Sequence, residues 1–307
     1  MANLKGLRER INSIKSTQKI TKAMKMVAAA KVKRSETATK ASRPFTQGLY
    51  ELFQKLMSAT DGIDFETKKY ENSINNYPAL LAKREIKTVG LLVLTSNKGL
   101  AGAYNANLIR KTLAKIQEYN SSGIKTLLFV VGTKGVASLE RKKNSYGFEI
   151  AKVYTKFPQE ITFSMSQIVA EDLADAYVEQ KIDKVEIITT MFKNMMSYSV
   201  TSFGLLPLDV EKPNYEDGIP EPLMEFEPDA DALLQTLTPM YFSNIIYQAF
   251  LEATASELAS RMMAMSAATD NAETMLNNLT VEYNKARQFA ITQELIEIVG
   301  GAGALKK

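Results

Sequence analysis

The 307-residue chain contains neither cysteine nor histidine. Without cysteine it can form no disulfide, supply no thiolate nucleophile and hold no metal through sulfur. Without histidine it also lacks the most common general base, the usual zinc ligands and every Ser-His or Cys-His catalytic arrangement. An enzyme built on this chain would have to rely on carboxylates, alone or with magnesium.

Long hydrophobic runs and targeting segments are also missing. No window of 18 consecutive apolar residues occurs, so the sequence predicts no membrane-spanning helix. No signal-peptide pattern is present. The basic, acid-poor N-terminus could be read as a mitochondrial transit peptide, but its apolar heptads favour mature structure.

Proline and glycine are absent from the 60 residues 240–299, which lie between Pro239 and Gly300. Inside this stretch, apolar or small residues recur at alternating steps of four and three: Leu251, Ala255, Leu258, Met262, Met265, Thr269, Ala272, Leu276, Leu279, Tyr283, Ala286 and Ala290. This heptad pattern predicts a supercoiled helix about 90 Å long. Thr238 and Pro239 suit its N-cap and first helical position.

Residues 7–43 lack proline and glycine too, which predicts a second long helix. Its apolar stripe starts at Leu4, Leu7, Ile11 and Ile14 and is expected to continue on a shifted phase at Ile20, Met24 and Val27. Pro44 and Gly48 interrupt the pattern, and apolar residues from Leu49 onward extend it. A long helix cannot bury such a stripe alone. We expect the two ends of the chain to pair as an antiparallel coiled coil; a homodimer in which each helix pairs with its copy is the alternative.

The net charge of +4 conceals an uneven distribution. Residues 1–43 hold twelve basic and two acidic residues, a net charge of +10, whereas residues 209–231 are acidic and rich in proline. A helix this basic predicts an acidic partner, such as a phosphate, an anionic lipid or an acidic protein surface.

In the middle of the chain the spacing of apolar residues changes, and short apolar runs typical of buried strands alternate with helical patterns. Strands are predicted at 88–95, 126–131, 148–153, 185–190 and 196–203, and helices at 104–119, 133–141 and 164–180. Strands that alternate with helices indicate a mostly parallel α/β sandwich, here inserted between the two long helices, with the last strand antiparallel. The turn Thr95–Gly102 and the segment Val131–Gly135 follow strands and contain glycine, yet neither matches a phosphate-binding loop or a dinucleotide motif. Glycine in such turns has a backbone role alone.

Several segments are recognisable beyond their periodicity. They are QKITKAMKMVAA at 18–29, ASELASRMMAMSAATDN at 255–271, YNKARQ at 283–288, ITQE at 291–294 and EIV at 297–299. Together with Thr95–Gly102 and Leu205–Leu208 they resemble the gamma subunit family of the F-type ATP synthase, in order and over essentially the whole chain.

The resemblance implies the central rotor shaft of the F1 sector, a non-catalytic subunit without cofactor or metal. Its expected parts are an N-terminal shaft helix at 1–59, a Rossmann-like α/β domain with its connections at 60–208, an acidic proline-rich linker at 209–237 and a C-terminal shaft helix at 238–307. The implied partners are the alpha and beta subunits, which enclose the shaft, the epsilon subunit and the c-ring of Fo. No nucleic acid is implied. The implied location is peripheral, on the cytoplasmic face of a bacterial cell membrane.

Family positions that meet the beta subunit map onto nine residues: Lys22, Met24, Lys25, Met26, Arg261, Arg287, Gln288, Thr292 and Glu294. The first four face the acidic lever loop in the family, and the last four lie at its upper contact. Four positions depart from the family pattern. Asn97 and Lys98 stand where Asp-Arg is frequent, Lys25 where an acidic residue is common, and Phe289 where a small residue is expected. The absence of cysteine argues against the redox-switched chloroplast form.

Two other classes of function compete with the shaft. A coiled-coil protein that binds nucleic acid through its basic helix predicts salt-sensitive binding, but that helix lacks aromatic stacking positions. An enzyme built on the α/β domain predicts a saturable nucleotide or small-molecule site near Gly99.

Overall fold

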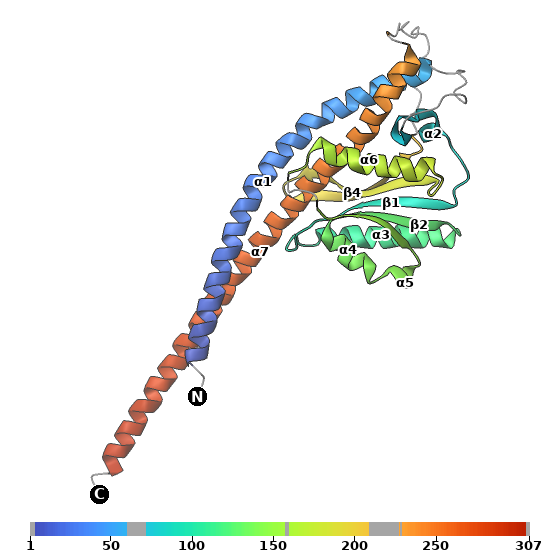
Figure 1. The fold of residues 1–307 in the computed structure, drawn as a ribbon. Coiled ribbons are helices and arrows are strands. Elements are labelled where there is room, and N and C mark those ends of the chain that lie inside the picture. Colours follow the sequence, from blue (N-terminus) through green and yellow to red (C-terminus); the bar gives the residue numbers. More distant parts are fainter. Residues whose placement is uncertain (1–3, 60–71, 157–159, 209–226, 228, 305–307) are drawn as a thin grey trace, which may run out of the picture. The chain divides into compact units, whose positions relative to one another are not determined.

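A computed structural model describes residues 4–59, 72–156, 160–208, 227 and 229–304. Its internal contacts divide the chain into two units, residues 1–30 with 261–307 and residues 31–260. Two long helices run through both units: α1 covers Leu4–Ala59 and α7 covers Ala230–Ala304 (Figure 1). Of the predicted linker at 209–237, residues 209–226 and 228 lie outside the described residues, and so do residues 60–71 of the predicted connection at 60–83.

The larger unit contains a five-stranded sheet with strand order β3-β2-β1-β4-β5. Its strands are β1 (Thr88–Leu94), β2 (Lys125–Val131), β3 (Glu149–Tyr154), β4 (Lys184–Asn194) and β5 (Ser197–Leu206). The first four are parallel, and β5 returns antiparallel to β4. The connecting elements are η1 (Ser73–Asn75), α2 (Tyr77–Leu81), α3 (Tyr104–Ser121), α4 (Thr133–Glu140), α5 (Lys143–Tyr146) and α6 (Phe163–Val178). The predicted inserted, mostly parallel α/β domain is confirmed.

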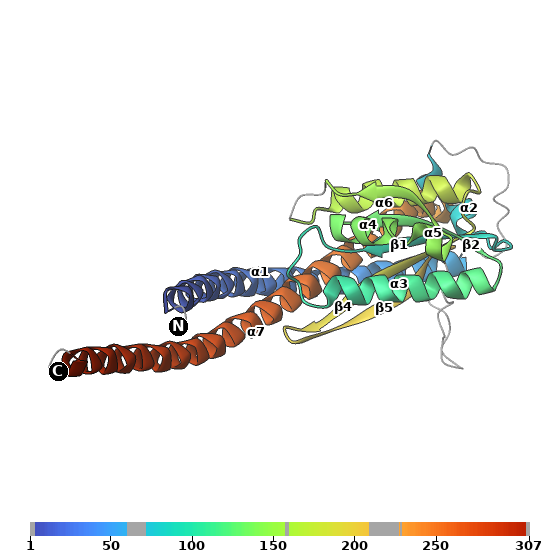
Figure 2. The same cartoon turned by 90° about the horizontal axis from the view of Figure 1, so that it is seen from below.

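Each face of the sheet buries its own apolar cluster. On one face Leu91 and Val93 of β1 pack with Leu108 of α3. On the other face the neighbouring side chains of β1, Leu92 and Leu94, pack with α6 and with the parts of α1 and α7 that belong to this unit. Figure 2 shows α3 and α6 on opposite sides of the sheet. The continuous apolar run of β1 is therefore that of a strand covered on both faces.

Helix α7 begins at Ala230, earlier than predicted, and Pro239 lies inside it. The assignment of Thr238 and Pro239 to the N-terminus was wrong. Asp229 performs that role: its Oδ1 accepts a hydrogen bond of 2.9 Å from the backbone N–H of Ala232. Leu234 and Phe242, on either side of Pro239, are completely buried, so packing offsets the backbone hydrogen bond that proline cannot make.

Helix α1 likewise continues through Pro44 and Gly48, and its predicted extension to residue 59 is confirmed. Beyond these two residues Leu49, Phe53 and Leu56 are buried in the apolar cluster of the larger unit. The same reasoning applies as in α7, because burial on the far side of the proline holds the helix together.

Candidate partner-binding surface of the long helices

The two long helices are paired within one chain and run antiparallel. In the smaller unit the hydroxyls of Thr21 and Thr269 form a hydrogen bond of 2.9 Å. In the larger unit Asn244 donates to the hydroxyl of Thr46 at 2.9 Å. Within that unit Arg43 also contacts Glu252, so residue numbers fall along α7 as they rise along α1. The heptad positions predicted for α7, from Leu251 to Ala290, are all buried or half-buried.

The shifted phase expected for the middle of α1 was wrong at Ile20 and Val27, whereas Met24 is half-buried. The helix keeps the spacing set by Leu4, Leu7, Ile11 and Ile14, and its inner positions continue through Gln18, Thr21, Lys25 and Ala28. Ile20 is 60% exposed and Val27 is 57% exposed. A pattern read from hydrophobicity alone follows these two residues, because the true inner positions are polar or small. As a result, large apolar side chains point away from the helix pair.

The C-terminal end of α7 also exposes apolar side chains. Phe289 is 71% exposed, and every residue from Ile291 to Val299 is exposed. In the smaller unit α7 continues past the N-terminal end of α1, so these residues have no helix beside them among those described (Figure 1). Exposed apolar groups gathered in this way mark a surface that another protein covers.

The loop that begins at Thr95 closes the N-terminus of α4 against a phosphate. At the N-terminus of α4, the N–H groups of Thr133, Lys134 and Gly135 donate to Asn97 Oδ1, the Ser96 carbonyl and Thr95 Oγ1, at distances of 3.1, 3.1 and 2.9 Å. A phosphate at a helix N-terminus needs such N–H groups free. The first three are already occupied by the chain itself.

Glu186 is a buried carboxylate that an enzyme could have used as a base. Its Oε1 accepts hydrogen bonds from Tyr119 at 2.5 Å and from Lys184 at 2.6 Å. Burial raises the pKa of Glu186, but the hydrogen bonds from Lys184 and Tyr119 outweigh it and hold the pKa below its usual value. A carboxylate that is charged and already paired in this way is a poor proton acceptor.

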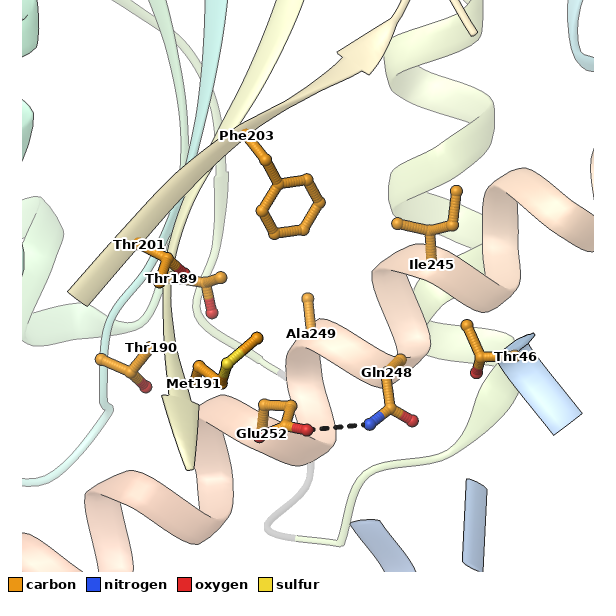
Figure 3. Close-up of a pocket in the computed structure, with 10 residues that line it drawn as sticks. All are labelled: Thr46, Thr189, Thr190, Met191, Thr201, Phe203, Ile245, Gln248, Ala249 and Glu252. Carbon is orange, nitrogen blue, oxygen red and sulfur yellow. Dashed lines mark hydrogen bonds between the residues drawn. The ribbon is translucent and has the colours of Figure 1, made fainter. Parts of the chain in front are cut away.

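A cavity of about 200 Å³ lies between the β4–β5 pair and α7 (Figure 3). Phe203 of β5 and Ile245 and Ala249 of α7 supply apolar walls, and Thr46 of α1 closes one side. Its single ionisable lining residue, Glu252, is occupied by a 3.0 Å hydrogen bond from Gln248. The described residues also contain no group of three or more acidic side chains that could hold a metal ion. The cavity therefore lacks the groups of a catalytic site.

Comparison with known proteins decides the family. The family model described as ATP synthase matches residues 3–305. The ATP synthase gamma chain of Synechococcus sp. strain JA-3-3Ab is 39% identical, with 99% of this chain and 100% of the relative aligned. That of Desulforamulus reducens is 38% identical, with all of both chains aligned. The chain belongs to the ATP synthase gamma chain family. As a gamma chain it is a non-catalytic subunit.

Solved gamma-family structures agree with the fold. A chain of the Tetrahymena thermophila mitochondrial ATP synthase central stalk and c-ring matches with a TM-score of 0.57 and 27% identity, covering 81% of this chain and 99% of that one. A chain from the Euglena gracilis mitochondrial enzyme matches with a TM-score of 0.66 and 20% identity, covering 98% and 94%. Together they support two long helices around an inserted α/β domain. Across the part of the chain that the structure describes, no helix is both long and apolar enough to cross a membrane.

The nine residues carried over from the family resemblance lie mostly on the outside of the helices. Lys22, Met26, Arg287, Gln288, Thr292 and Glu294 are exposed, and Met24 and Lys25 are half-buried. Arg261 differs, because it is only 9% exposed and packs inside the helix assembly. Ile20, Val27 and the apolar end of α7 were missed as surface residues. For Ile20 and Val27 the signal in the sequence is the strict heptad phase of α1, which places both residues on the outside of the helix pair.

Proposed function

We propose that this chain is the central rotor shaft of the ATP synthase, which couples ion-driven rotation of the c-ring to the conformational cycle of the beta-subunit catalytic sites. Membership in the gamma chain family and the central-stalk title of the Tetrahymena relative support this role. The observation that carries it is the antiparallel helix pair with large apolar side chains on its outer surface, including Ile20, Val27 and Phe289.

The shaft acts without forming or breaking bonds. A surrounding subunit changes state only if the shaft binds its alternative conformations unequally. The exposed groups of the helix pair provide the means, since they differ around its circumference. The apolar end of α7 and the outward-facing Ile20 and Val27 suit the apolar inner walls of an alpha–beta ring, which would cover them.

The basic side of α1 suits an acidic partner. Residues 1–43 carry a net charge of +10, and Lys22 is exposed while Lys25 is half-buried. We assign this side to the acidic lever loop of a beta subunit, where opposite charges attract at short range and are screened by salt. Arg287, Gln288, Thr292 and Glu294 form the upper contact, and Arg261 supports the helices between the two.

The α/β domain is the part of the chain to which rotation is applied in this proposal. In this assignment it contacts the epsilon subunit and the c-ring of Fo, and so receives the rotation that the helices deliver to the ring of alpha and beta subunits. In this assignment the chain lies peripherally at the cytoplasmic face of a bacterial cell membrane.

Co-expression with alpha and beta subunits tests the proposal. We expect size exclusion to give a complex with a single copy of this chain, and ATP hydrolysis that depends on its presence. If the chain elutes alone or as a homodimer and has no effect on hydrolysis, the proposal is wrong and the basic helix has a different acidic partner. A matched sample that carries Ile20→Asp and Val27→Asp should assemble less, because two charges would enter an apolar contact.

A further inference from the structure

Strand β4 extends beyond the end of its pairing with the parallel strand β1. β4 extends from Lys184 to Asn194, but β1 pairs with it only as far as Ile188. Phe192 lies beyond that point and keeps β5 as its sheet neighbour through Tyr198. A strand that outlasts its neighbour leaves backbone N–H and C=O groups that need other partners.

An ion pair from the two long helices supplies these partners. Glu252 of α7 accepts a hydrogen bond of 2.7 Å on Oε2 from the N–H of Phe192. Arg43 of α1 donates to the carbonyl of Phe192 at 3.0 Å. The two side chains also bind each other, since Arg43 Nε and Nη2 lie 2.9 and 2.8 Å from Glu252 Oε1. The pair therefore acts on the end of β4 as a short piece of neighbouring strand.

The side chain of Phe192 is held by the same helices. It is 2% exposed and belongs to an apolar cluster with Val32 of α1 and with Ala255, Leu258 and Ala259 of α7. One residue of the sheet is thus fixed by both long helices, through its backbone and through its ring. All of these residues belong to the unit formed by residues 31–260.

The carboxylate of Glu252 is the centre of this arrangement. It is 7% exposed and also accepts a 3.0 Å hydrogen bond from Gln248. Hydrogen bonds to a charged acceptor are shorter and stronger than neutral ones, and a bidentate arginine adds a fixed orientation. A buried ion pair contributes little net stability compared with apolar side chains of similar size, so its effect is mainly on geometry.

We propose that Glu252, oriented by Arg43, is a positioning residue that fixes strand β4 to both long helices and sets the torsional stiffness of the shaft where torque passes between the α/β domain and the helices. This inference rests on the proposed function. The covalent connections still join the domain to the helices without the pair, so its loss softens the joint rather than disconnecting it.

Single-molecule rotation of the assembled complex measures this stiffness. With the alpha–beta ring fixed to a surface, a bead is attached to the α/β domain through Lys111→Cys, an exposed position in a chain without other cysteines. We expect Glu252→Gln to widen the angular distribution of the bead during pauses while the ring still hydrolyses ATP. Hydrogen exchange of the Phe192 amide should become about tenfold faster or more, since a hydrogen bond to a charged group is lost.

A double variant separates positioning from folding. Arg43→Met with Glu252→Met replaces the pair by apolar side chains and leaves no unpaired buried charge, so it should lose less stability to urea than a variant that removes one partner only. The N–H and C=O of Phe192 still lose their side-chain partners, so the joint remains soft. The matched control is Glu51→Gln, the same chemical change at an exposed carboxylate of α1 that bonds Gln47. It should leave the stiffness unchanged.

The outcomes are distinguishable. If the parent chain does not assemble or does not rotate, the proposed function is wrong. If the parent rotates and the double variant keeps its full stiffness, the positioning role of Glu252 is wrong. The double variant keeps this test decisive even where a single substitution prevents folding.

Discussion

At the scale of single residues, Asp183 fixes the start of two neighbouring strands. Its Oδ1 accepts a 2.8 Å hydrogen bond from Arg84, and its Oδ2 accepts the N–H groups of Thr88 and Lys87 at 2.9 and 3.0 Å. Burial raises the pKa of Asp183, but the hydrogen bonds from these two backbone groups and from Arg84 outweigh it, so the pKa lies below its usual value. The carboxylate therefore stabilises the fold only while it is ionised.

The sign of the pH dependence follows from that depressed pKa. The Asp183 carboxylate contributes its full stabilisation above the pKa of about 3.9 that it has in the unfolded chain. This stabilisation is lost as the pH falls through the lower pKa of the folded chain. We predict that Asp183→Asn lowers the free energy of unfolding by about 2 kcal/mol at pH 7. We also expect the variant to lose less stability than the parent chain when the pH is lowered. Urea unfolding at pH 7 and near pH 3 measures both effects. Asp175→Asn, an exposed change on α6, should follow the parent chain; equal behaviour of the two variants would contradict the assignment.

Gly135 shows why the glycines after β2 are structural. A Cβ at this position would lie 2.3 Å from Thr95 Oγ1, which accepts the N–H of Gly135 and donates to the Val131 carbonyl at 2.6 Å. Alanine is the better helix former by about 1 kcal/mol, yet we predict that Gly135→Ala destabilises the chain by about 1–3 kcal/mol through this clash. Thermal unfolding measures it. The same substitution at Gly48 of α1, where nothing lies within 4 Å, should instead be stabilising.

At the scale of elements, strands and α/β helices were predicted well and helix details less well. β1 and β2 are continuous apolar runs between turns, so their bounds lie within a residue of the prediction. The predicted start of α7 was wrong because Thr238 and Pro239 also have the residue types of a helix start. Asp229, the residue that caps the helix, lies in an acidic segment where it does not stand out. The phase of α1 was missed because its inner positions are polar or small, so hydrophobicity pointed to the outward-facing Ile20 and Val27. The joint at Phe192 could not be predicted, since nothing in the sequence brings Arg43, Phe192 and Glu252 together.

The corrected phase of α1 has a direct test. Ala28 is 2% exposed and faces the second helix, whereas Ile20 faces outward. We predict that Ala28→Leu costs about 1–3 kcal/mol by overpacking, and that Ile20→Ala changes the free energy of unfolding by less than about 0.5 kcal/mol. Circular dichroism during urea unfolding of the full chain measures both. The shifted phase would require the opposite order, with the larger loss at Ile20.

At the scale of the whole molecule, the chain combines a closed interior with open surfaces. The α/β domain buries both faces of the central strands of its sheet, and residues of its polar loop bond the first N–H groups of α4. The long helices instead leave apolar side chains at Ile20, Val27 and Phe289 in solvent, beside a strongly basic segment. Such a distribution costs solubility in an isolated protein and fits the proposed assembly, in which surrounding subunits cover these side chains.

Arg287 tests that surface in the complete complex. It is exposed on α7 and belongs to the proposed upper contact with a beta subunit. A hydrogen bond to a charged group contributes about 1.5–3 kcal/mol, so we predict that Arg287→Glu lowers ATP hydrolysis of the assembled complex about tenfold without changing its helical content. The control is Lys285→Glu, the same charge reversal at an exposed position two residues away, which should retain activity. If both reversals reduced hydrolysis equally, the general charge of α7 would be responsible. If Arg287→Glu retained full synthesis and hydrolysis, Arg287 would have no part in the contact.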